Sequence, residues 1–138
     1  MILEVGPDGK WRVVWAGKPL ITDCTFRLEV EEWGDVQSPE LISTNKTTGE
    51  DPLGAYQETA SAFRVGGSVI AARSVRVYEK REFVTVEFTV CNESKTKDVR
   101  LQGLALIDGQ LCVPAAGARA LTCQWERYCG EDGLVEVG

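Results

Sequence analysis

The chain has 138 residues, of which 43% are hydrophobic and 26% charged, with a formal net charge of −6 and no histidine. This length suits one globular domain, and the acidic balance disfavours binding to nucleic acid or to anionic membranes. The absence of histidine excludes Ser-His-Asp and Cys-His nucleophile pairs, histidine-ligated zinc and histidine acid–base catalysis.

The chain begins with ILEV and KWRVVW on either side of the turn-forming residues GPDG, which predicts a hairpin. A second turn, AGKP at 16–19, leads into a long extended run over 20–33. In that run Cys24, Phe26, Leu28 and Val30 alternate with polar residues. Such alternation is typical of a sheet with one buried and one solvated face.

Residues 43–55, STNKTTGEDPLGA, are polar and rich in glycine, proline and threonine, so we expect the main loop here. Strand-like runs follow at 59–65, 68–79 and 83–92, separated by the hairpin signal Gly66-Gly67 and by a charged turn. Within 83–92 the inward side chains should be those of Val84, Val86, Phe88 and Val90.

The polar turn ESKTKD at 93–98 precedes the run VRLQGLALID, a tight turn at Gly109, and two further strand-like segments, QLCVP and ARALTCQWERYC. No segment predicts an amphipathic helix. We therefore predict an all-β, antiparallel β-sandwich of about ten strands with little or no helix. It forms a single domain over residues 1–138, or one that is truncated at its C-terminus.

The N-terminus lacks the basic and apolar regions of a secretory signal peptide, and no apolar stretch approaches the roughly 20 residues of a membrane span. We expect a cytoplasmic protein that has no cofactor and binds neither nucleic acid nor membranes. The cysteines are odd in number and contain no C-x-x-C pair, so buried or half-buried free thiols in a reducing cytosol are expected. A Cys123–Cys129 or Cys112–Cys123 bridge is the alternative. The five cysteines are Cys24, Cys91, Cys112, Cys123 and Cys129.

Four tryptophans, Trp11, Trp15, Trp33 and Trp125, are candidates for carbohydrate contacts, since an indole can cover the apolar face of a pyranose. The alternative is that they pack in the core or at a sheet edge. Trp33 is the strongest candidate because it ends a predicted strand beside Gly34-Asp35, where loops carry function.

Acidic residues cluster around Glu31, around Asp51 and around Asp132, and two carboxylates roughly 5 to 10 Å apart could hydrolyse a glycoside. A solvated acidic face is the alternative, and no cluster follows the calcium-loop pattern, so no metal site is predicted. The basic residues of 64–81 should point outward from their strands. They are Arg64, Arg73, Arg76, Lys80 and Arg81.

Three features together resemble a known family. They are Asp51-Pro52-Leu53-Gly54, the alternation from Thr59 to Val65, and VRVYEKREFVTVEFTVCNES at 75–94. This pattern is similar to the N-terminal β-supersandwich domain of α-galactosidase and raffinose-synthase-type glycoside hydrolases, a galactose-mutarotase-like sandwich. The similarity covers roughly residues 50–108.

The resemblance implies a non-catalytic accessory domain, because the family's catalytic aspartates lie on a following (β/α)₈ barrel that this chain lacks. A mutarotase activity would need a histidine acid, which is also missing. The expected partners are such a barrel, if the chain is part of a longer protein, and a carbohydrate. The predicted sugar contacts are Trp33, Asp51 and Trp125. The alternatives are a protein-interaction or structural sandwich without a small-molecule ligand, and a small enzyme with paired carboxylates.

Overall fold

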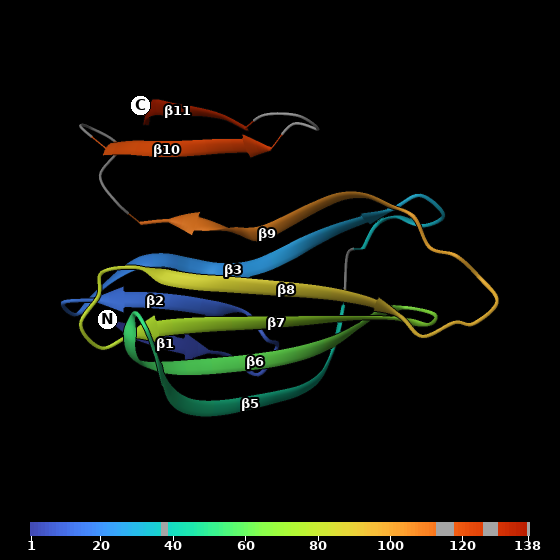
Figure 1. The fold of residues 1–138 in the computed structure, drawn as a ribbon, viewed down its shortest axis with the longest axis horizontal. Helices are drawn as coiled ribbons and strands as arrows, with labels where there is room; N and C mark the ends of the chain where they lie inside the picture. The colour runs from blue at the N-terminus through green and yellow to red at the C-terminus, as the bar shows by residue number, and fades with distance from the viewer. Residues whose placement is uncertain (37–38, 113–117, 126–129, 138) are drawn as a thin grey trace.

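The computed structural model describes residues 1–36, 39–112, 118–125 and 130–137; for Asp35 and for the last two ranges it describes the backbone only. These residues form eleven strands and no helix (Figure 1). No helix in the described ranges could therefore cross a membrane. The strands are β1 (Ile2–Val5), β2 (Trp11–Trp15), β3 (Lys18–Val30), β4 (Gly34–Asp35), β5 (Glu40–Asp51), β6 (Gly54–Gly66), β7 (Val69–Tyr78), β8 (Val84–Asn92), β9 (Leu101–Leu111), β10 (Ala118–Trp125) and β11 (Gly130–Val137).

Two antiparallel sheets make up the sandwich. One has the order β1-β2-β3-β9, with the two-residue β4 beside the end of β3, and the other has the order β5-β6-β7-β8. The predicted all-β, antiparallel, sandwich-like class is confirmed. Without β4 each sheet has four strands, so the sandwich has eight strands and not about ten. The predicted strands on either side of Gly109 are one strand, β9, and the last predicted strand, β10, pairs with β11 in a separate two-stranded sheet. In the other direction, the sequence did not predict β5.

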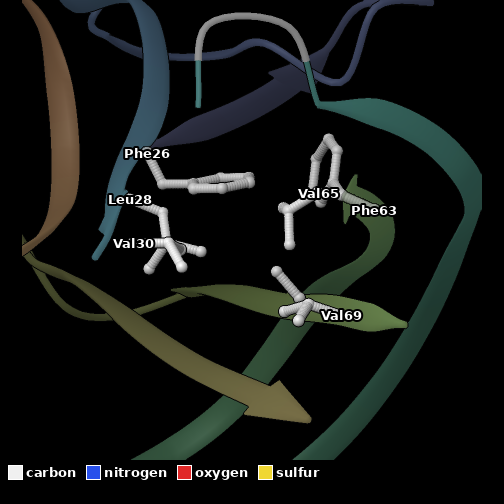
Figure 2. Packing of buried hydrophobic residues seen from close by; sticks show 7 residues of the cluster. Phe26, Leu28, Val30, Phe63, Val65 and Val69 are labelled. Carbon is white, nitrogen blue, oxygen red and sulfur yellow. The ribbon is translucent and has the colours of Figure 1, made fainter. Parts of the chain in front are cut away.

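The core lies between the two sheets. Phe26, Leu28 and Val30 of β3 face Val65 of β6 and Val69 of β7 (Figure 2). The ring of Phe26 lies 5.0 Å from that of Phe63, edge to face, and a second cluster around Trp11 continues the core. The alternation predicted for β3 is thus confirmed, as is the inward set on β8, whose four members all pack against the two clusters.

The prediction of a main loop over 43–55 was wrong. Residues 43–51 belong to β5, which pairs with β6 from Glu40 to Asp51, and residues 54–55 begin β6. Only Pro52 and Leu53 form the turn between the two strands. The error has a physical cause. β5 is an edge strand with mostly exposed side chains, so its sequence carries no apolar signal although its backbone is fully paired on one side.

Gly109 does not form a tight turn, because β9 continues through it to Leu111. A Cβ atom at this position would lie 2.8 Å from Cys24 Sγ and 2.9 Å from the carbonyl oxygen of Thr22. Glycine therefore lets β9 approach β3 closely, which is a recognised reason for glycine inside a strand.

Arg73 does not point outward as predicted. It lies on the inner face of β7 with 2% of its surface exposed, and burial lowers the pKa of its guanidinium to about 10. Arg73 and Val75 are two residues apart on β7, so their side chains point to the same face of the strand, and both are buried. The cation is accommodated over the ring of Phe63, 5.1 Å from its centroid.

Three cysteines are free thiols, as predicted: Cys24, Cys91 and Cys112. The prediction that they are buried or half-buried is wrong for Cys91 and Cys112, which are exposed. Cys24 is buried, and this burial raises the pKa of its thiol to about 11 despite the nearby charge of Arg73. Cys123 and Cys129 lie outside the side chains that the structure describes.

Candidate functional site

Three connections meet at one end of the sandwich, at the right in Figure 1: the β3–β4 turn, the β6–β7 turn and the β8–β9 loop. Between them is a groove of about 900 Å³. This volume falls in the range of small-molecule sites, about 300 to 1,000 Å³. Its lining residues are Glu32, Trp33, Val36, Val65, Gly66, Gly67, Ser68, Ser94, Thr96, Lys97, Asp98 and Val99.

Trp33 forms one wall of this groove and is 44% exposed. Its backbone N–H donates to the carbonyl oxygen of Val30 at 3.1 Å, which closes the turn after β3. The indole lies against Gly66, where a Cβ atom would come within 2.9 Å of Cζ3. Gly66-Gly67 thus supplies both the predicted hairpin turn and a surface without side chains on which the indole rests.

The β8–β9 loop forms another part of the lining, and Asn92 holds this loop in place. The Asn92 side-chain oxygen accepts hydrogen bonds from Ser68 Oγ at 2.7 Å and from the Ser94 N–H at 3.1 Å. Its amide nitrogen donates to the carbonyl oxygen of Lys97 at 2.7 Å. Ser94 Oγ in turn accepts from the N–H groups of Thr96 and Lys97. Hydrogen bonds from Asn92 and within the loop itself therefore hold the β8–β9 loop in position.

The groove combines an indole face with short polar side chains. Hydroxyl groups come from Ser68, Ser94 and Thr96, carboxylates from Glu32 and Asp98, and an ammonium group from Lys97. Such a site can stack a flat or apolar ring face and hydrogen-bond the groups at its rim. The sequence pointed to Trp33 alone. Residues 93–98 have the composition of an ordinary polar turn. Their sequence does not indicate that they line a groove with an indole about 60 residues earlier in the chain.

Asp51 lies at the other end of the sandwich, as the last residue of β5 before the turn to β6. Its Oδ1 accepts the N–H of Leu53 and its Oδ2 accepts the hydroxyl of Tyr78, both at 2.8 Å. Partial desolvation opposes ionisation, but these two bonds and the nearby charge of Arg76 together lower the pKa of the Asp51 carboxyl. Asp51 and the Trp33 groove are separated by the length of β6, about 40 Å at 3.3 Å per residue.

At this end of the sandwich, Arg76 contacts three side chains on the outer face of β6 and β7 and at the end of β5. Its Nε bonds Glu58 Oε2 at 2.5 Å, its Nη1 lies 3.7 Å from Asp51 Oδ2, and the guanidinium lies over the ring of Tyr56. The bond from Arg76 lowers the pKa of the Glu58 carboxyl. The two carboxylates are therefore bound to a shared cation, which suits bracing of a turn better than acid–base catalysis.

The remaining predicted contacts have different environments. Trp11 is a core residue with 1% exposure, whereas Trp15 is exposed at the end of β2. The backbone of Trp125 ends β10, and its side chain lies outside those described, so this prediction stays a prediction. Within the described residues, no three potential ligands gather as a metal site would require.

Comparison of the chain with protein-family models, with curated proteins and with solved structures gives no match. The likeness to glycoside hydrolase sandwiches therefore stays a hypothesis from short motifs.

Proposed function

We propose that this chain is a non-catalytic, carbohydrate-associated domain that holds a sugar ring in the Trp33 groove. The observation that carries the proposal is the exposed indole that rests on Gly66-Gly67 and lines the same groove as a polar loop held by hydrogen bonds. The apolar face of a pyranose would cover the indole, while its hydroxyl groups would exchange hydrogen bonds with Asp98 and Lys97 on the loop.

The wider role follows from the resemblance over residues 50–108, which suggests an accessory domain that packs on the catalytic barrel of a glycoside hydrolase. The absence of histidine and the engagement of Asp51 and Glu58 by Arg76 support a non-catalytic role. Galactose-containing oligosaccharides are accordingly the first ligands to test.

The test is a glycan array followed by titration calorimetry with the sugars that bind. Trp33→Ala should weaken binding at least about tenfold, which corresponds to 1.4 kcal/mol. Trp15→Ala is the matched control, because Trp15 is equally exposed, at 45% against 44%, but does not line the groove. Trp33→Phe should keep part of the affinity, since it retains a ring.

Two results would contradict the proposal: no binding to any sugar on the array, or binding that Trp33→Ala leaves unchanged. Absence of binding would favour the second candidate, a protein-interaction sandwich without a small-molecule ligand. The observation in favour of that candidate is the apolar edge strand β9, which is independent of the groove.

A further inference from the structure

Strand β9 is an unusually apolar edge of the sandwich. Five large aliphatic side chains on it are 40–59% exposed: Leu101, Leu104, Leu106, Ile107 and Leu111. One edge of β9 pairs with β3, and within the described backbone its other edge pairs with no strand, since β10 pairs with β11 instead. Long apolar edges are ready templates for another strand, so native proteins usually shorten them or protect them with charge.

Two of the other three edges, β1 and β5, follow that rule. β1 has only four residues, and β5 carries Glu40, Lys46, Glu50 and Asp51. β9 has eleven residues and a single charge, that of Asp108. The remaining edge, β8, has nine residues and also a single charge, that of Glu87. Of these two weakly charged edges, only β9 carries large aliphatic side chains that are exposed.

The sequence of β9, LQGLALIDGQL, is nearly the same when read in either direction about Leu106. Three positions on each side of the centre carry identical residues: Leu101 and Leu111, Gln102 and Gln110, and Gly103 and Gly109. Two such strands placed antiparallel about a two-fold axis at Leu106 set each of these residues opposite its own kind. A two-fold interface is self-complementary in the same way, because residue i meets j and j meets i.

We propose that two copies of this chain associate through β9, edge to edge and antiparallel, with Leu106 on the two-fold axis. The main-chain groups of the free edges then pair, as in other strand-addition interfaces. Leu101 packs against Leu111 of the second copy, and the amides of Gln102 and Gln110 lie opposite each other. These are the cross-strand pairs that stabilise a sheet.

The charges also favour this arrangement. Although each copy carries a net charge of −6, Asp108 lies opposite Leu104 of the second copy, so the interface sets no two carboxylates directly against each other. The Trp33 groove is formed by turns and a loop and includes no residue of β9, so dimerisation and sugar binding can be tested separately.

The test begins with sedimentation velocity of the full chain across a concentration series. The wild type should be a dimer, and Leu106→Lys should be a monomer with an unchanged circular dichroism spectrum. Ile42→Lys is the matched control, because Ile42 is 48% exposed on the edge strand β5 and should leave the dimer intact.

Disulfide cross-linking tests the register without relying on loss of association. With Cys91, Cys112, Cys123 and Cys129 replaced by serine and the buried Cys24 kept, Leu106→Cys should form an interchain disulfide, identified by mass spectrometry of the linked peptides. Directly opposed strand residues have Cα atoms about 4.5 to 5.5 Å apart, within disulfide range. Leu104→Cys should not link to itself, because the two positions would be about 13 Å apart along the strand.

A wild type that is monomeric at 100 µM would overturn the proposal, as would a dimer that survives Leu106→Lys. Preferential cross-linking through Leu104→Cys would overturn the proposed register. A monomer would leave β9 to be covered by another part of a longer protein.

Discussion

Arg73 Nη2 donates a hydrogen bond to the carbonyl oxygen of Gly9 at 2.5 Å, and this bond joins the centre of β7 to the turn of the first hairpin. The contact crosses the sandwich from one sheet to the other. It is tight around Phe63, since a Cβ atom at Gly9 would lie 2.7 Å from that ring. Nε and Nη1 of Arg73 are buried without a hydrogen-bond partner, so the side chain contributes through packing and this one bond.

Arg73→Lys should lower the free energy of unfolding by about 3 kcal/mol, because a compact ammonium group would be buried without a counter-charge. Arg73→Met should cost less, about 1 kcal/mol, since it keeps the apolar stem and removes the charge. Urea unfolding monitored by tryptophan fluorescence measures both. A lysine variant as stable as the wild type would mean that the guanidinium is not desolvated.

Gly66→Ala should disturb the Trp33 groove, because the new methyl group would meet the indole at 2.9 Å. Gly54→Ala is the matched control: Gly54 also has a positive φ, of 123°, but open space around its Cα. Both variants should lose about 1 kcal/mol to backbone strain. Only Gly66→Ala should also shift the Trp33 indole resonance in a ¹H–¹⁵N spectrum. An equal shift in both variants would contradict this packing.

Gly109→Ala should destabilise the fold by about 2 kcal/mol, since its Cβ would press on Cys24 Sγ and on the Thr22 carbonyl, which cannot move aside. Gly103→Ala on the same strand meets Glu29 Oε2 at 3.2 Å, the end of a flexible side chain, and should cost less than about 1 kcal/mol. Thermal unfolding of the two variants side by side tests the close approach of β9 to β3. Equal melting temperatures for the two variants would contradict the close approach of β9 to β3 at Gly109.

Acid should destabilise the end of the sandwich that Arg76 braces. The folded-state pKa values of Asp51 and Glu58 lie below their ordinary values of 3.8 and 4.5. Their contribution to stability is therefore complete above about pH 4.5 and is lost as the pH falls through the lowered values.

The double variant Asp51→Asn, Glu58→Gln should flatten the dependence of the free energy of unfolding on pH between 2 and 5. Urea unfolding at a series of pH values measures this dependence. Glu87→Gln is the control, because Glu87 lies exposed on the same face and makes no ion pair with a described residue. A double variant with the full wild-type dependence would show that other carboxylates cause it.

Much of the architecture was predictable from local patterns. The period-two alternation of β3 and β8 identified their buried faces, and GPDG and Gly66-Gly67 marked two hairpins. The candidate site was predictable only in part. Trp33 is recognisable as an aromatic residue at a strand end, whereas the β8–β9 loop that lines the same groove has the polar composition of most loops and gives no signal.

What the amino-acid sequence determined by itself is the set of local properties: the absence of histidine chemistry, the alternation that makes strands, and the turns that end them. The tertiary structure alone decided the properties that depend on distant neighbours. It paired the polar β5 with β6, buried Arg73, placed Gly109 against Cys24, and brought Trp33 to Gly66. The physical reason is that strand pairing and sheet packing join residues far apart in the chain, so burial and contact at a position depend on partners that its own neighbourhood does not encode.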